Sequence, residues 1–596
     1  MKIKHLFGLA VIAAMTASCS SNEDLGTAGP GTGTNEAGVG YATFTINLPS
    51  TNGTRAGNPT YEQGTLDEYD VNDVTLLIFQ KTATSKSEGD YTFVEKAELG
   101  NMAPWKDENN SGGITASATI TAKLKNVALT GEGSTSDYYA LAILNNKDSK
   151  DKDKITLPTE STAESTTPPV TYGSWNAASN ADETRFKDNT KGFYMANAPV
   201  YIKDGEPTTL VNIDKVYATK QKAETNAATT IHVERGLAKV SIASNAFPST
   251  ALKPTGTKYN KDEVKITAWN LDVTNKSTFP IHKTAGLKNT NFSTIWSNTA
   301  STTGASVNRF VDGSNPSFKR VHWGIDPNYS DDLTTVAACE GAFNILPANA
   351  TIDGAADKPQ YCLENTFDIN HMKQGQTTRV VFKAKYKPNG FSDDETFYKI
   401  GNNTDLWNKT KLEEQIKAKA LEVLGKESAT NKVEVDLKAA DNNIEENAGT
   451  KILKEANVQH NGANVAPEEI KAINEKLGLK AAGTDPVVDP IVGIATYKSG
   501  ESYYIARIKH FGDLTPWAEG QETYGTNNDA YNTKYLGRYG VLRNNWYELS
   551  IGSVSGPGTP DVPTIKPDEP DDESYKYISV SVKILSWAKR SQDVNL

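Results

Sequence analysis

The sequence predicts a mainly β protein with two successive β-sandwich domains, a small helical insertion in the second domain and an isolated last strand. Runs in which every second residue is apolar recur between turn residues, as half-buried strands require. At 596 residues the chain is too long for one compact core, which favours at least two domains. Each element is taken below in chain order.

The composition is typical of an extracellular β-protein. The hydrophobic share is 37% and the formal net charge is -11, alongside stretches rich in Thr, Asn, Ser and Gly. Nucleic acid is not an expected partner, because phosphate binding needs a basic face that this composition does not suggest.

Residues 1–18 have the pattern of a secretory signal. A basic start precedes an apolar run over residues 6–15, which is too short to span a bilayer permanently. Three small residues then precede Cys19. This resembles a bacterial lipobox, in which the thiol is lipidated and becomes the new N-terminus, although Thr16 stands where Leu is usual. The alternative is an ordinary signal peptide with a chance cysteine.

Residues 19–55 are predicted to form a propeptide that contains a flexible tether and one strand. The Gly- and Thr-rich stretch before residue 41 cannot bury enough apolar surface to fold. Residues 41–48 alternate between apolar and polar side chains, as in a half-buried strand. Arg55 follows in a small-residue loop that a protease could enter. A trypsin-like cut between Arg55 and Ala56 would remove the strand together with the lipid; a merely solvated arginine is the alternative.

Two domains are expected after the loop. Strand-like runs recur through residues 56–230, with a hairpin that turns at Asp204 and Gly205. A second set of strands fills residues 231–555 and is interrupted by a helical insertion over residues 405–480. Within the insertion, apolar residues at helical spacing predict helices over residues 409–424 and 467–477.

The C-terminal end is predicted to be a stiff spacer followed by an isolated strand. Residues 556–574 are rich in Pro and Asp, which favours an extended chain. Residues 575–596 have no local hairpin partner. The apolar residues of this strand alternate, and Trp587 is expected to anchor its continuation; the alternating residues are Ile578, Val580, Val582 and Ile584. The alternative is that the segment folds back as an edge strand of its own second domain.

No catalytic or metal-binding constellation is evident. The seven histidines include no pair at metal-ligand spacing, and neither a nucleophile elbow nor a phosphate-binding loop occurs. We therefore expect no enzymatic activity, metal or cofactor. Cys339 and Cys362 could form a disulfide in an exported protein, or they could be two buried free thiols.

Taken together, the lipobox, the removable strand, the Arg-Ala loop, the two β-domains and the last strand resemble the layout of type V fimbrillins of Bacteroidales-type bacteria. Within that family the chain is most similar to the major subunits of short, or minor, fimbriae. Local matches lie at residues 139–146, 233–235, 541–547 and 582–587, with Ser586 at a position where Pro is expected.

The resemblance implies tandem transthyretin-like sandwiches and a shaft subunit that supports adhesion and biofilm formation. Cys19 would hold the precursor in the outer membrane, and an Arg-specific protease would cut between Arg55 and Ala56. The vacated groove would then accept residues 575–596 of a neighbour, the donor strand. The implied partners are identical subunits and accessory tip and anchor subunits, in an extracellular fimbrium.

Two other classes of surface protein share part of this pattern. A glycan-binding lipoprotein of the outer membrane would also have a lipobox and β-sandwiches, but it would need no removable strand and should display exposed aromatic side chains. A surface hydrolase would need a pair of carboxylates or histidines that converge in a pocket.

Overall fold

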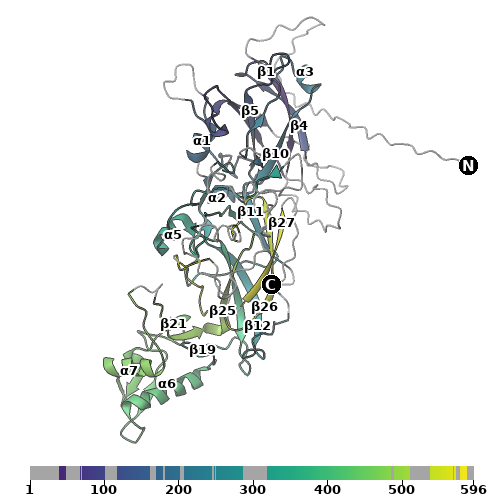
Figure 1. Cartoon of the computed structure of the whole chain (residues 1–596). Coiled ribbons are helices and arrows are strands. Elements are labelled where there is room, and N and C mark those ends of the chain that lie inside the picture. The colour runs from purple at the N-terminus through teal and green to yellow at the C-terminus, as the bar shows by residue number, and fades with distance from the viewer. Residues whose placement is uncertain are drawn as a thin grey trace, which may run out of the picture.

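The computed structural model describes residues 39–48, 68, 70–100, 117–160, 169–178, 181–201, 207–243, 247, 250–285, 319–368, 370–484, 489–510, 537, 539–567, 569–571 and 578–586. The molecule is elongated, with an N-terminal sheet at one end, a second group of sheets in the middle and a helical insertion at the other end (Figure 1). In the part of the chain described here, no helix has the length and apolar character needed to cross a membrane.

The N-terminal strands form a single eight-stranded sheet. Its order is β3 (Thr92–Gly100), β2 (Val74–Gln80), β5 (Tyr138–Leu144), β7 (Met195–Asn197), β10 (Thr229–Arg235), β1 (Gly40–Asn47) and β4 (Ser117–Leu124), with β9 (Val211–Asn212) paired to β5. The strand β1 therefore lies inside the sheet, between two neighbours.

This sheet curls until its two end strands approach each other. The Glu95 carboxylate on β3 accepts the backbone N–H groups of Lys125, at 2.9 Å, and Asn126, at 3.1 Å, just after β4. Side chains from β1, β2, β4 and β5 consequently share one apolar core. The predicted pair of sheets is not confirmed for this domain, because the strands join into one curled sheet.

The strands β2 and β5 are buried on both faces, as their continuous apolar runs require. Their second face packs on aromatic residues of α1 (Tyr172–Ala178) and α2 (Glu183–Phe186). The short helices η2 (Glu88–Asp90) and α3 (Lys220–Glu224) complete this domain.

In the C-terminal domain two sheets pack around one core. The order of the first is β17 (Gln360–Leu363), β11 (Leu237–Ile242), β26 (Asn545–Val554) and β27 (Ile578–Ser586), and that of the second is β12 (Glu263–Asp272), β18 (Arg379–Lys387) and β25 (Glu501–Arg507). Short pairs lie around them: β13 (Thr274–Asn275) with β16 (Phe343–Asn344), β14 (Ser277–Thr278) with β6 (Ala181–Asp182), and β15 (Lys319–Arg320) with β8 (Val200–Tyr201), near α5 (Val336–Ala342).

The insertion has a core of its own and lies between β18 and β25. It contains two three-stranded sheets. The order of the first is β19 (Phe397–Ile400), β24 (Ile494–Tyr497) and β21 (Gly449–Lys451), and that of the second is β20 (Val433–Val435), β22 (Val458–His460) and β23 (Ala463–Asn464). The helices are α6 (Lys409–Leu424) and α7 (Pro467–Lys476), with the short turns η7 (Glu455–Asn457) and η8 (Lys498–Gly500). Both predicted helices are confirmed, and α7 ends one residue early.

The C-terminal segment differs from the prediction of a free spacer and an unpartnered strand. The strand β27 pairs antiparallel with β26 from Ile578, opposite Val554, to Ser586, opposite Asn545, so it is an edge strand of its own domain. Residues 556–571, here called the strap, lie along the same domain, with Val562 and Ile565 buried. Backbone carbonyls of the strap accept hydrogen bonds from side chains of the domain: Gly556 from the Tyr504 hydroxyl at 3.0 Å, and Pro563 from the Arg379 guanidinium. A solvated spacer would not make these bonds.

We predict that Phe44→Ala destabilises the uncut protein by about 3–5 kcal/mol, because it removes a fully buried ring. The matched control is Thr45→Ala, which should cost at most about 0.5 kcal/mol, since its hydroxyl bonds only an exposed neighbour. Urea unfolding of both variants checks this. Equal costs at the two positions would show that β1 does not contribute to the core as described.

Candidate functional site

The candidate site is the position of β1 in the N-terminal sheet. β1 runs parallel to β10, with Phe44 opposite Thr229, and antiparallel to β4 along its full length. Both edges of β1 are thus hydrogen-bonded. Without β1, the facing edges of β10 and β4 would lose these partners, and unpaired backbone groups are costly when they are buried.

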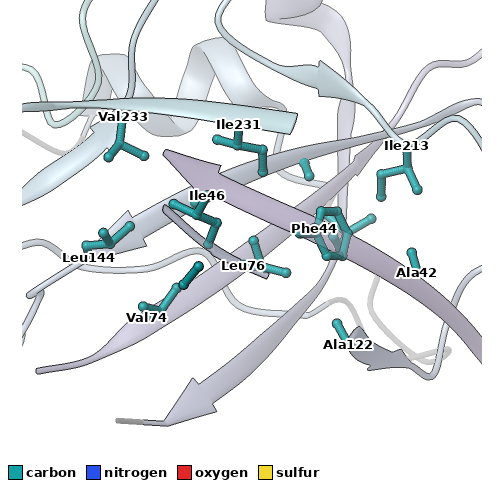
Figure 2. Close-up of a cluster of buried hydrophobic side chains, with 14 of the residues drawn as sticks. Ala42, Phe44, Ile46, Val74, Leu76, Ala122, Leu144, Ile213, Ile231 and Val233 are labelled. Carbon is teal, nitrogen blue, oxygen red and sulfur yellow. The ribbon is translucent and has the colours of Figure 1, made fainter. Parts of the chain in front are cut away.

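One face of β1 is embedded in the core. Ala42, Phe44, Ile46 and Leu48 are buried, with Phe44 and Ile46 at 0% exposure. Figure 2 shows Phe44 and Ile46 among the apolar side chains that surround them, from Leu76 to Ile231. At about 1.5–3 kcal/mol for each large side chain, Phe44, Ile46 and Leu48 contribute on the order of 5–9 kcal/mol. Loss of β1 would open an apolar groove.

The opposite face of β1 is polar and uncharged. Thr43 and Thr121 share a hydroxyl hydrogen bond of 2.8 Å, and Thr45 and Thr119 share one of 3.0 Å. On β10, His232 lies opposite Asn47, and burial lowers the pKa of its imidazole. The His232 imidazole, on this side of the groove, is therefore uncharged at neutral pH.

Beyond the predicted cut, the chain is anchored again at Glu68. Its buried carboxylate accepts hydrogen bonds from Lys239, at 2.6 Å, and from the Tyr361 hydroxyl, at 2.8 Å. Its carbonyl accepts two bonds from Arg235. The Lys239 ammonium also lies 3.9 Å from the centre of the Trp546 ring. Residue 68 is thereby fixed to β11 and β17 of the C-terminal sheet and to β10 of the N-terminal sheet.

A second buried network joins the two domains. The carboxylate of Glu364 accepts a bond of 3.2 Å from Arg543, and the imidazole of His282 lies 2.8 Å from Glu234 of β10. Glu364 and His282 themselves approach to 3.9 Å. These contacts connect β10, which borders the groove, to the C-terminal domain.

Some of the predicted site residues fall outside the described part of the chain, and others are described by their backbone alone. Cys19, Arg55, Ala56 and Trp587 lie outside the described residues, and the backbone alone is described for the alternating residues Ile578, Val580, Val582 and Ile584. Among the described residues, no group of three or more potential ligands could hold a metal ion.

Cys339 and Cys362 are buried in two separate apolar clusters and do not form a disulfide with each other. Burial raises the pKa of the Cys362 thiol to about 12, which makes it unreactive. The alternative of two buried thiols is therefore the one that the structure contains.

The anchor at Glu68 and the docked strap were not predicted. Glu68 stands in an ordinary polar stretch, and its partners Lys239 and Tyr361 are far away in sequence, so no spacing could indicate the contact. The apolar Val562 and Ile565 within the Pro-rich run were a usable signal for burial of the strap.

Residues 495–593 match the family described as major fimbrial subunit protein type IV, fimbrillin, C-terminal. This span contains β25, β26, the strap and β27. The match confirms the expected fimbrillin resemblance for this part of the chain and supports a fimbrial subunit, a structural protein rather than an enzyme. No curated protein matches the chain.

Solved structures from Parabacteroides distasonis and Porphyromonas gingivalis are similar to this chain. A candidate cell adhesion protein from Parabacteroides distasonis shares 10% identity at a TM-score of 0.37, with 92% of this chain and 98% of that chain covered. A fimbrilin from Porphyromonas gingivalis shares 11% identity at a TM-score of 0.31, covering 91% and 96%. TM-scores below 0.5 do not establish a common fold.

We predict that Glu68→Ala destabilises the protein by about 3–5 kcal/mol, because it leaves the buried Lys239 ammonium without its carboxylate. Tyr361→Phe removes one hydrogen bond to the same carboxylate and should cost about 1 kcal/mol. Denaturant unfolding of the two variants measures the difference. A cost below that of Tyr361→Phe would show that Glu68 is not the anchor.

Proposed function

We propose that this chain, whose residues 495–593 match the fimbrillin C-terminal family, is the shaft subunit of a cell-surface fimbria. It is exported as a lipoprotein precursor, cut after Arg55 and polymerised by strand exchange. The observation that carries the proposal is the interior position of β1, a strand that a cut at Arg55 would separate from the rest of its sheet.

The cut has a defined effect because the chain is anchored on both sides of it. Leu48 is buried at the end of β1, and Glu68 is bonded to both domains. A cut between Arg55 and Ala56 leaves the anchor at Glu68 with the mature chain. Lipidation of Cys19 would hold the precursor at the outer membrane until β1 and the lipid leave together.

The donor is residues 575–596 of a neighbouring subunit. In the uncut chain β27 pairs with one neighbour in its own sheet, β26, so its release breaks one ladder of hydrogen bonds. The position of β1 offers two such ladders, one with β10 and one with β4. In a vacated groove the same strand gains two ladders and an apolar core. This difference favours exchange once β1 has gone.

Donor and acceptor are different surfaces of one subunit, so the contact repeats without closing and produces a filament. Tip and anchor subunits would end such a filament, which would serve adhesion and biofilm formation. Among the described residues the one exposed large apolar side chain is Leu129. A platform of exposed aromatic rings, which a glycan-binding lipoprotein should display, is therefore absent from the described surface.

We predict that Arg55→Ala yields unpolymerised precursor, since β1 stays in its groove. Arg55→Lys is the matched control, because an Arg-specific protease should leave it uncut while an added lysine-cutting protease restores assembly. Electron microscopy and N-terminal sequencing of surface material give the readout. Filaments of normal length from Arg55→Ala would rule out removal of β1 as the trigger.

A subunit that lacks residues 575–596 should accept a donor but supply none. Mixed with processed wild-type subunits, it should shorten filaments in proportion to its share of the mixture. Filament length by electron microscopy measures this, and circular dichroism confirms that the truncated subunit is folded. If the folded truncated subunit alone forms filaments of normal length, the donor assignment is wrong.

A further inference from the structure

The sequence of β1 and the sequence of the proposed donor strand are similar residue by residue. Residues 41–50 read Tyr-Ala-Thr-Phe-Thr-Ile-Asn-Leu-Pro-Ser, and residues 577–586 read Tyr-Ile-Ser-Val-Ser-Val-Lys-Ile-Leu-Ser. Aligned in the same direction, they share the first tyrosine, the last serine and two small hydroxyl residues on the polar face. Both also place apolar residues at the four positions that face the core.

From this alignment we propose that the donor strand enters the groove in the same direction as β1, with Tyr577 at the place of Tyr41 and Ile584 at the place of Leu48. The inference rests on the proposed function and adds the register and the direction of the joint. It makes the occupant of the groove the segment 577–584 of a second copy of this chain.

The apolar face cannot decide the direction. Ile578, Val580, Val582 and Ile584 read Ile-Val-Val-Ile from either end, so they fill the sites of residues 42, 44, 46 and 48 equally in both directions. In either case a larger residue replaces Ala42 and a smaller one replaces Phe44, which largely conserves the volume that fills the core.

The polar face separates the two directions. In the same direction, Ser579 and Ser581 replace Thr43 and Thr45, and their hydroxyls can renew the bonds that Thr121 and Thr119 make in the uncut chain. In the opposite direction, Lys583 would stand at the site of Thr43, which is only 8% exposed. A charged ammonium there would be largely withdrawn from water, and on β4 it would face the hydroxyl of Thr121 rather than a carboxylate.

The site of Gly40 limits where pairing begins. A Cβ atom at this position would approach Val216 Cγ1 to 2.3 Å, so the side chain of Lys576 cannot follow the path of β1 there. The small Ser586 would fit this site better in the opposite direction. However, Gly40 is the first residue of β1, where an incoming chain can diverge, whereas the site of Thr43 lies inside the strand.

Paired cysteines test the direction in assembled filaments. In the variant Thr119→Cys with Ser581→Cys, the two cysteines lie opposite each other in either direction of the donor strand. This pair therefore reports strand exchange itself. The cysteines of Thr121→Cys with Ser579→Cys lie opposite each other only if the donor runs in the direction of β1. Those of Thr121→Cys with Lys583→Cys lie opposite each other only if it runs the other way. Within one chain β4 and β27 belong to different sheets, so a disulfide should join two subunits. Filaments are oxidised and separated by non-reducing electrophoresis, with single-cysteine variants as controls.

We expect ladders of linked subunits from the first two pairs and subunits of unlinked size from the third. Linkage of the first and third pairs alone would overturn the direction while leaving strand exchange in place. The absence of linkage in all three would overturn both the register and the donor assignment.

A second pair of variants needs no cysteine. Ser579→Lys should reduce filament yield at least tenfold, because it brings a charge to the site of Thr43, whereas Lys583→Ser should leave the yield unchanged. The reverse pattern, with Lys583→Ser improving assembly and Ser579→Lys neutral, would contradict the proposed direction.

Discussion

The backbone pairing of one interior strand is the constraint on which the rest of this structure depends. β1 satisfies the facing edges of β10 and β4 and fills the core between them. Any strand that takes its place must meet both demands at once, since unpaired edges and exposed apolar side chains are both unfavourable in water. The N-terminal domain therefore always needs a strand at this position, but that strand does not have to come from its own chain.

Glu68 and the strap are bonded to the folded domains in ways that suit this demand. Glu68, which follows Arg55 in the sequence, binds side chains of both domains, so a chain cut after Arg55 would keep this anchor. At the other end the strap is bonded to the C-terminal domain as far as Asp571, whose N–H donates to the carbonyl of Met372 at 3.0 Å. Release of β27 therefore need not disturb the strap.

Local pattern predicted several strands and both insertion helices, because alternation and helical spacing report which face of an element is buried. The strand at residues 41–48 is an example. The turn of the hairpin expected at Asp204 and Gly205 lies outside the described residues. Pattern could not show that β27 pairs with β26, because its apolar faces suit any open sheet edge, nor that the N-terminal sheet curls until Glu95 meets the backbone after β4. The partners of Glu68 depend on contacts between residues far apart in sequence, which only the folded chain brings together.

The central claim is that the groove of β1 is filled first by the chain itself and then by another subunit. Hydrogen exchange at the amides of β10 and β4, followed by mass spectrometry in three states, tests it most directly. We expect protection in the uncut precursor, loss of protection in cut but unassembled subunits, and restored protection in filaments. Protection that persists in cut, unassembled subunits, or that does not return in filaments, would contradict the account.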